Sequence, residues 1–350
     1  QASIFALGIM PYITASIVIQ LAGMVLPSFQ KMQREGESGR MKLNQYTRYL
    51  TVLILLVQGP AYLMNLKYQI ASAGGHVEMG FWTIAFMTIV LAAGSMFFMW
   101  LGERIDQKGV GNGISLVLLF NILSSVPSDF QTLYIRFISG KNVATMVVAA
   151  IIIAAAIIAL VVFTIILNDA QRTIPVQYSR RVQGRGLVGG QSSNIPLKVN
   201  TASVMPVIFA SSLMTMPVVV GQIIKVDYST IPGQILMALN SGSWCNPDRP
   251  IYSIGLVIYI LLLYFFAYFY TSISFNPLEI ANNMKKQGGF IPGIRPGKPT
   301  SDYLDNILTY IIFIGATGLA IVAIIPIFVS GVFNVGRISF AGTSLIIIVG

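Results

Sequence analysis

Side chains able to carry out acid–base, nucleophilic or metal chemistry are scarce in the apolar parts of this chain. His76 is the single histidine and Cys245 the single cysteine, so neither a histidine-based metal site nor a cluster of thiolates is expected. The sequence holds no HExxH motif and no pair of aspartates within an apolar run, which leaves nowhere to place a buried general base. We therefore expect no catalytic residue, no metal ion and no cofactor.

One segment superficially resembles a phosphate-binding loop. Residues 293–300 read GIRPGKPT, in which Lys298 follows a glycine. In a phosphate-binding loop the first glycine lies one residue further from the second, and a serine or threonine follows the lysine. Here Pro299 stands at that place, which removes both the hydroxyl group and a backbone amide. Nucleotide hydrolysis is therefore not expected.

Polar side chains inside the apolar runs are uncharged; they include Thr14, Ser16, Gln20, Asn121, Ser211 and Ser212. Hydrogen bonding to a neighbouring helix is the commoner role of such groups in membranes. An ion-coupled transporter of small solutes, the first alternative function, normally needs an ionisable residue within its spans. An intramembrane hydrolase, the second, would need a buried arrangement of Ser, Asp or His. The apolar runs offer neither.

Branched aliphatic side chains could instead form the seal of a conduit. Ile9 and Ile13 are four residues apart, which places them on one face of a helix. A ring of such side chains excludes water and ions by dewetting and close packing, yet it can part around a bulky apolar passenger. A narrow ion filter would need backbone-carbonyl sequences or rings of charge, and neither is seen. Core packing or contact with lipid is the competing, commoner role for isoleucine in a membrane helix.

Basic residues gather in two long connections. Residues 169–198 carry a basic, glycine-containing tip, RRVQGRG at 180–186, between short runs typical of β-strands. Residues 276–305 carry Lys285, Lys286, Arg295 and Lys298. Loops of this length in a compact protein are usually functional or disordered, and these lack low-complexity composition. They indicate either docking of a partner or contact with anionic lipid.

Long apolar elements must position these groups. Hydrophobic residues make up 55% of the chain and charged residues only 10%, against roughly 25% in soluble proteins. Runs without charge cover residues 1–30, 49–66, 79–102, 109–128, 142–168, 199–224, 250–278 and 306–336, with a ninth beginning at 338. Because about 20 apolar residues span a bilayer, the sequence predicts eight membrane-spanning helices and the start of another.

The distribution of Lys and Arg predicts the orientation. Sixteen of the 22 lie in the odd-numbered connections between these runs. The positive-inside rule places those connections in the cytoplasm. The formal net charge of +10 therefore reflects membrane topology more than binding to nucleic acid.

A short pattern occurs twice on this frame. Residues 9–16 read IMPYITAS and residues 204–211 read VMPVIFAS, each within an apolar run. The predicted orientation makes the two segments antiparallel, as in an inverted-topology repeat. Ile208 is then the counterpart of Ile13. We interpret Pro11 and Pro206 as interruptions of two membrane helices at corresponding depths.

Several stretches resemble the SecY/Sec61-alpha family, the channel-forming subunits of the Sec protein translocase. The resemblance runs in order through essentially the whole chain. Its motifs are residues 2–13 (ASIFALGIMPYI), 35–40 (EGESGR) with 45–49 (QYTRY), 100–104 (WLGER) with 109–115, 196–200 (PLKVN) and 290–297 (FIPGIRPG).

The resemblance implies an all-α, polytopic membrane helix bundle of two inverted-topology halves around a central pore. The halves would be residues 1–141 and 142–350. The nine segments would be the second to tenth of ten helices, with the first helix, most of the plug and the end of the tenth outside these 350 residues. Relatives often carry isoleucine where Leu118 stands. The implied pore ring is Ile9, Ile13, Leu118, Ile208 and Ile347; the implied lateral gate is Thr14, Gln20, Ser212 and Met216.

The resemblance also implies a role and partners. The chain would be a non-enzymatic channel for unfolded secretory polypeptides in the bacterial cytoplasmic membrane, releasing membrane-protein helices sideways into lipid. Its partners would be the SecE and SecG subunits, the SecA motor, the ribosome including its RNA, signal peptides, nascent chains and membrane lipids. The implied docking residues are Arg180, Arg181, Arg185 and Arg295. Relatives often carry two adjacent arginines where this chain has Gly184 and Arg185, which alters the expected contact pattern.

Overall fold

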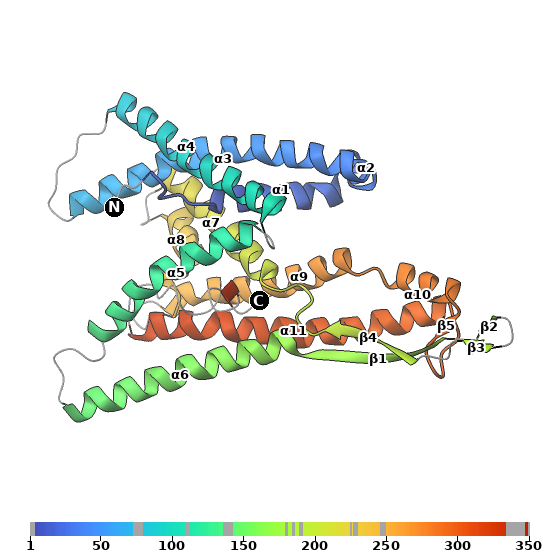
Figure 1. The fold of residues 1–350 in the computed structure, drawn as a ribbon. Coiled ribbons are helices and arrows are strands. Elements are labelled where there is room, and N and C mark those ends of the chain that lie inside the picture. Colours follow the sequence, from blue (N-terminus) through green and yellow to red (C-terminus); the bar gives the residue numbers. More distant parts are fainter. Residues whose placement is uncertain are drawn as a thin grey trace. The chain divides into compact units, whose positions relative to one another are not determined.

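The computed structural model describes residues 4–72, 80–109, 113–135, 143–178, 181–183, 186–188, 192–224, 226, 230–245, 250–333 and 347–348. This part of the chain is mostly α-helical (Figure 1). The α-helices are α1 (Met10–Val25), α2 (Pro27–Arg34), α3 (Glu37–Ser72), α4 (Phe81–Lys108), α5 (Gly113–Leu133), α6 (Val143–Asp169), α7 (Met205–Ile224), α8 (Ile231–Leu239), α9 (Ile254–Ser274), α10 (Pro277–Lys286) and α11 (Lys298–Phe333). The shorter elements are β1 (Gln171–Tyr178), β2 (Arg181–Gln183), β3 (Gly186–Val188), β4 (Ser192–Lys198), β5 (Gly289–Phe290), η2 (Ser241–Ser243) and η3 (Pro250–Ser253).

Each of the eight predicted apolar runs contains a helix. Among the described residues, six helical segments are long and apolar enough to cross a membrane: Met41–Met64, Phe81–Lys108, Gly113–Leu133, Met146–Asp169, Pro250–Lys286 and Lys298–Ser330. Two shorter apolar helices, Met10–Gly23 and Met205–Gly221, hold the repeated pattern. Most of the ninth run lies outside the described residues.

The two repeated prolines do not interrupt helices, contrary to our interpretation of the sequence. Pro11 lies in the first turn of α1, and Pro206 is the second residue of α7. A proline in the first turn removes an amide that would have no partner within the helix, and its fixed φ suits helical backbone. The prolines therefore start both helices at the same position.

The chain packs into two compact units. One contains residues 1–128 and 211–255, and the other contains residues 129–210 and 256–350. These units describe packing and not the sequence repeat, so the division into halves at residue 141 stays a prediction.

In the first unit, α3 packs against α1, α2 and α4. Arg48 of α3 donates two hydrogen bonds to Glu103 near the end of α4. They run from Nε to Oε1 at 2.9 Å and from Nη2 to Oε2 at 2.6 Å. Beside this pair, a side chain at Gly113 would collide with the backbone oxygen of Gly102. The amide of Gly113 also donates to the carboxylate of Asp106 at 2.6 Å. The end of α4 and the start of α5 are therefore closely packed.

In the second unit, the predicted β-like runs form a sheet with strand order β4-β1-β5. Strand β1 pairs with β4 from Gln171 opposite Lys198 to Gln177 opposite Ser192. One face of this ribbon is apolar: Ile174 and Val176 are buried, as is Leu197 on β4. Pro175 is tolerated because β1 has only one neighbouring strand at that position.

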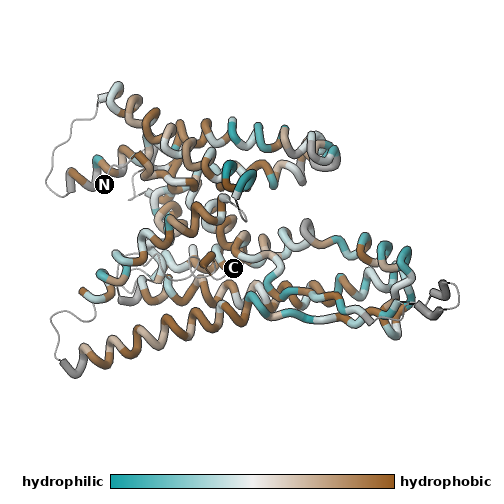
Figure 2. The backbone as a smooth tube through the Cα atoms, viewed as in Figure 1, coloured by the Kyte–Doolittle hydropathy of each residue, from teal (hydrophilic) through white to brown (hydrophobic). Residues whose placement is uncertain are grey.

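Small residues bring α11 close to other parts of the second unit. A side chain at Gly315 would collide with the backbone oxygen of Val199, and one at Gly318 with the side chain of Leu167. Small residues that permit close approach are the usual basis of helix packing in membranes. Figure 2 shows apolar residues along α6, α9 and α11, and polar residues gathering at the end that carries α10 and the strands.

Candidate functional site

Helix α1 presents the two predicted ring residues from its first turns. The carbonyl of Ile9, the N-cap residue, accepts hydrogen bonds from the amides of Tyr12 and Ile13 at 3.1 and 3.2 Å. Both isoleucines are buried, with exposed fractions of 1% for Ile9 and 8% for Ile13. The next residue, Thr14, is also buried and donates its hydroxyl to the carbonyl of Met10 at 3.0 Å. These apolar side chains therefore lie inside the first unit and do not face outward as a lipid contact would.

Helix α7 begins with the same hydrogen-bond pattern. The carbonyl of Val204 accepts from the amides of Val207 and Ile208 at 3.1 and 3.2 Å. Val204 thus corresponds to Ile9, Pro206 to Pro11 and Ile208 to Ile13. The sequence repeat is therefore a repeat of local backbone structure as well as of residue types.

The other ring residues lie on three different elements. Ile208 is half-buried on α7, Leu118 is half-buried on α5, and Ile347 belongs to a short helical piece near the end of the chain. Ile9, Ile13 and Leu118 belong to the first unit, and Ile208 and Ile347 to the second. The closure of these residues into one ring stays a prediction.

The predicted gate residues all belong to the first unit. On α1, Gln20 is exposed and donates from Nε2 to the hydroxyl of Ser16 at 3.2 Å. On α7, Ser212 and Met216 are half-buried and lie four residues apart, hence on one helix face. The gate assignment stays a prediction, which can be tested on α1 and on the face of α7 that carries Ser212 and Met216.

The predicted docking residues are only partly described. Arg180 and Arg185 lie outside the described residues, and Arg181 begins β2, where it is the register partner of Val188 in β3. Arg295 is exposed, and its backbone carbonyl accepts a hydrogen bond from the hydroxyl of Thr300 at 2.8 Å. It lies between Gly293 and Gly297, which both have positive φ, at 86° and 108°. This turn presents the guanidinium group outward.

The sequence did not reveal that the two long loops share one sheet. Gln177 and Tyr178 of β1 are the register partners of Phe290 and Gly289 of β5. A two-residue strand carries no periodic signal from which it could have been found. The pairing fixes the segment that leads to Arg295 against β1, the strand that precedes the separate β2–β3 hairpin with Arg181.

The described residues contain little that could carry out chemistry. No group of three or more His, Cys, Asp or Glu residues among them is arranged to hold a metal ion. Asp129, directly after the fourth apolar run, is buried and makes contacts within the structure. Sequence reasoning had passed over this residue because it follows the charge-free run.

Comparison with known proteins agrees with these features. The SecY family profile matches residues 3–350. The protein translocase subunit SecY of Streptomyces galbus is 42% identical over 367 residues, which cover 100% of this chain and 79% of that protein. The subunit of the same name from Halalkalibacterium halodurans is 43% identical over 352 residues, covering 99% of this chain and 79% of the relative.

Solved structures share the fold at lower sequence identity. One described as a protein-conducting channel superposes with a TM-score of 0.65 at 18% identity, covering 99% of this chain and 79% of that one. The Sec61 channel in a canine ribosome–channel complex gives 0.62 at 17% identity, with the same coverages. The predicted class, an all-α polytopic membrane bundle of the SecY type, is confirmed. From its family profile and its close relatives, the chain belongs to the SecY family.

Proposed function

We propose that this multi-pass membrane protein is a protein-conducting channel. It passes unfolded secretory polypeptides across the bacterial cytoplasmic membrane and releases apolar helices sideways into lipid. Membership of the SecY family over residues 3–350 carries this proposal, because the family consists of non-enzymatic translocase channel subunits. The alternative of an ion-coupled solute transporter has no support from the comparisons.

The seal of the closed channel is a ring of aliphatic side chains. Ile9 and Ile13 from α1, Leu118 from α5, Ile208 from α7 and Ile347 line it. The matching starts of α1 and α7 support the assignment, because they place Ile13 and Ile208 at the same position in two repeated helices. Aliphatic side chains exclude water from a narrow pore. They bind no residue of a passing polypeptide specifically, so a polypeptide of any sequence can displace them.

The lateral gate lies between α1 and α7. Thr14 and Gln20 form one side, and Ser212 and Met216 the other. These side chains are small, flexible or weakly polar, so their separation exposes no unpaired charge to lipid. A signal peptide enters between the two helices and reaches lipid there.

The two basic loops form the docking surface for partners on the cytoplasmic side. Arg180, Arg181 and Arg185 in the first loop and Arg295 in the second are the contacts. A guanidinium group binds phosphate and carboxylate through paired hydrogen bonds, so it serves both ribosomal RNA and an acidic motor protein. The SecA motor and the ribosome dock here, and the SecE and SecG subunits complete the channel.

The decisive experiment is transport by the reconstituted complex. Vesicles containing this chain with its partner subunits, motor and ATP are given a secretory precursor, and protease-protected precursor is measured. Protection that depends on both ATP and a signal sequence supports the proposal. Uptake of a small solute by the chain alone, without protection of the precursor, contradicts it.

A further inference from the structure

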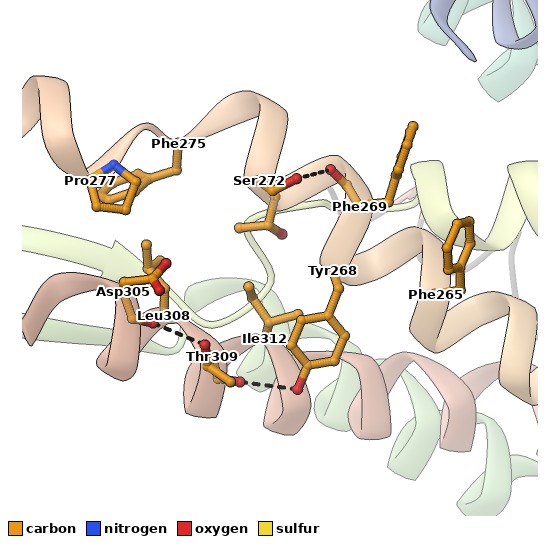
Figure 3. A pocket seen from close by; sticks show the side chains of 11 residues that line it. Phe265, Tyr268, Phe269, Ser272, Phe275, Pro277, Asp305, Leu308, Thr309 and Ile312 are labelled. Carbon is orange, nitrogen blue, oxygen red and sulfur yellow. Dashed lines mark hydrogen bonds between the residues drawn. The ribbon is translucent and has the colours of Figure 1, made fainter. Parts of the chain in front are cut away.

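A groove in the second unit contains none of the residues assigned to the pore ring, the lateral gate or partner docking. It lies between α9 and α11, beside the start of α10, and has a volume of about 490 Å³ (Figure 3). Phe265, Tyr268, Phe269 and Phe275 supply aromatic walls from α9 and the residue after it. The volume is within the roughly 300–1,000 Å³ of typical small-ligand pockets.

Hydroxyl groups in the groove donate to backbone carbonyls. Tyr268 donates to the carbonyl of Thr309 at 3.2 Å, Thr309 to that of Asp305 at 3.0 Å, and Ser272 to that of Phe269 at 2.8 Å. The carboxylate of Asp305 differs, because it forms no ion pair or hydrogen bond with any residue that the structure describes. The groove therefore offers a ligand one free anionic acceptor among aromatic surfaces.

The groove crosses from apolar to polar parts of both helices. Asp305 is the last charged residue before the apolar run 306–336, and Pro277 lies at the end of the run 250–278. Figure 3 shows Asp305 and Pro277 at one end of the groove and Phe265 at the other. At 1.5 Å per residue, the helix from Phe265 to Phe275 rises about 15 Å, half of a hydrocarbon core of about 30 Å. The groove thus has the depth of one leaflet, with its carboxylate at the predicted cytoplasmic surface.

We propose that this groove binds a phospholipid of the cytoplasmic leaflet whose head group carries a primary ammonium. The ammonium pairs with Asp305, while an acyl chain lies along the aromatic side chains toward Phe265. Aromatic faces attract cations, and a carboxylate accepts charge-assisted hydrogen bonds from an ammonium. A trimethylammonium head cannot donate such bonds, and the carboxylate repels a head group with net negative charge. The proposal depends on membrane insertion and is independent of the proposed conduction of polypeptides.

A membrane-spanning helix of a partner fits the groove less well. Such a helix is about 10–12 Å wide with its side chains and about 30 Å long, whereas the groove is one leaflet deep. A single acyl chain ending at an interfacial ammonium matches both the depth and the position of the charge.

Lipid binding to the purified protein tests the proposal. The protein is placed in nanodiscs of dioleoyl phosphatidylethanolamine, phosphatidylcholine or phosphatidylglycerol, and retained lipid is counted by native mass spectrometry. We expect retention of phosphatidylethanolamine above the other two, and a loss of about ten-fold in D305N, since hydrogen bonds to charged groups contribute about that factor. In D302N, which removes an exposed carboxylate outside the groove, retention is expected to stay unchanged.

A second variant tests the apolar part of the groove while the carboxylate of Asp305 is kept. I312W fills the apolar floor and is expected to remove every bound lipid from this site, while circular dichroism verifies that the helices form. Equal retention of the three lipids, or equal losses in D302N and D305N, would overturn the proposal. The proposal would also be overturned if D305N lost a bound polypeptide and not a lipid, because the groove would then be a protein interface.

Discussion

Gln177 of β1 and Phe290 of β5 are antiparallel register partners, so one short sheet joins the two long basic loops. Through this sheet the segment that leads to Arg295 is held against β1, which precedes the separate hairpin of β2 and β3 with Arg181. Two segments far apart in sequence therefore meet in one sheet, which suits docking of a large partner. The same coupling means that damage to one loop should disturb the other.

Reversing the charge at Arg295 tests the docking surface. We expect R295E to reduce motor-driven export by about ten-fold or more, because it replaces charge-assisted hydrogen bonds by repulsion. Export of a precursor into inverted membrane vesicles measures the effect. K67E, a charge reversal at an exposed position near the end of α3 that is predicted to lie outside, is the matched control and should export normally. Normal export by R295E would exclude this docking role.

Removing aliphatic side chains tests the pore ring. Replacing Ile9, Ile13 and Ile208 together with glycine should let ions leak through the resting channel, because the seal depends on apolar volume. Single-channel conductance in planar bilayers is the measurement. The control replaces Ile152 with glycine. This residue is 61% exposed on α6, so the change weakens a helix to the same extent per residue and should leave conductance unchanged. Equal conductance of the triple variant and the unaltered protein would remove these residues from the ring.

A disulfide tests the lateral gate. Cysteines at Thr14 and Met216 should crosslink efficiently in the resting protein and poorly once a signal peptide is engaged. Cys245 is first replaced by serine; burial raises the pKa of its thiol, so at neutral pH it forms little of the reactive thiolate. Gel mobility after oxidation reports the yield. Crosslinking that is insensitive to the signal peptide would contradict the gate assignment.

Adding one methyl group tests the turn between α4 and α5. G113A should destabilise the protein by about 1–3 kcal/mol, because its Cβ would collide with the backbone oxygen of Gly102. Thermal unfolding in detergent measures the loss. G80A is the control: Gly80 is the N-cap of α4, where an added Cβ would meet nothing within 4 Å, so the loss should be limited to a weaker cap and stay below that of G113A. Similar stability of G113A and G80A would disprove the close approach.

The ion pair between Arg48 and Glu103 should couple α3 to α4 modestly. Their side chains are 45% and 22% exposed, so a double-mutant cycle with R48M and E103Q should give about 0.5–1 kcal/mol. The coupling should weaken as salt is added. The longer pair of Lys42 and Glu35, at 3.7 Å and with both side chains at least half exposed, should show no measurable coupling. Equal coupling for the two pairs would mean that bidentate geometry contributes nothing.

The sequence by itself determined the features that depend on local composition. Long runs without charge identify membrane helices, because an isolated charge in hydrocarbon is costly, and the uneven Lys and Arg content of the connections predicts their orientation. The pattern shared by residues 9–16 and 204–211 located two equivalent helix starts, since capping and proline geometry are local properties. The position of Pro11 and Pro206 within those helices was misjudged, because a proline signals a helix boundary as readily as a break.

The tertiary structure alone decided which distant residues meet. The pairing of Gln177 with Phe290 and that of Arg48 with Glu103 depend on register and helix packing, for which neither partner carries a local signal. The free carboxylate of Asp305 in an aromatic groove likewise became visible only once α9 and α11 were side by side. Contacts of this kind arise from the packing of whole elements, and no spacing along the chain encodes them.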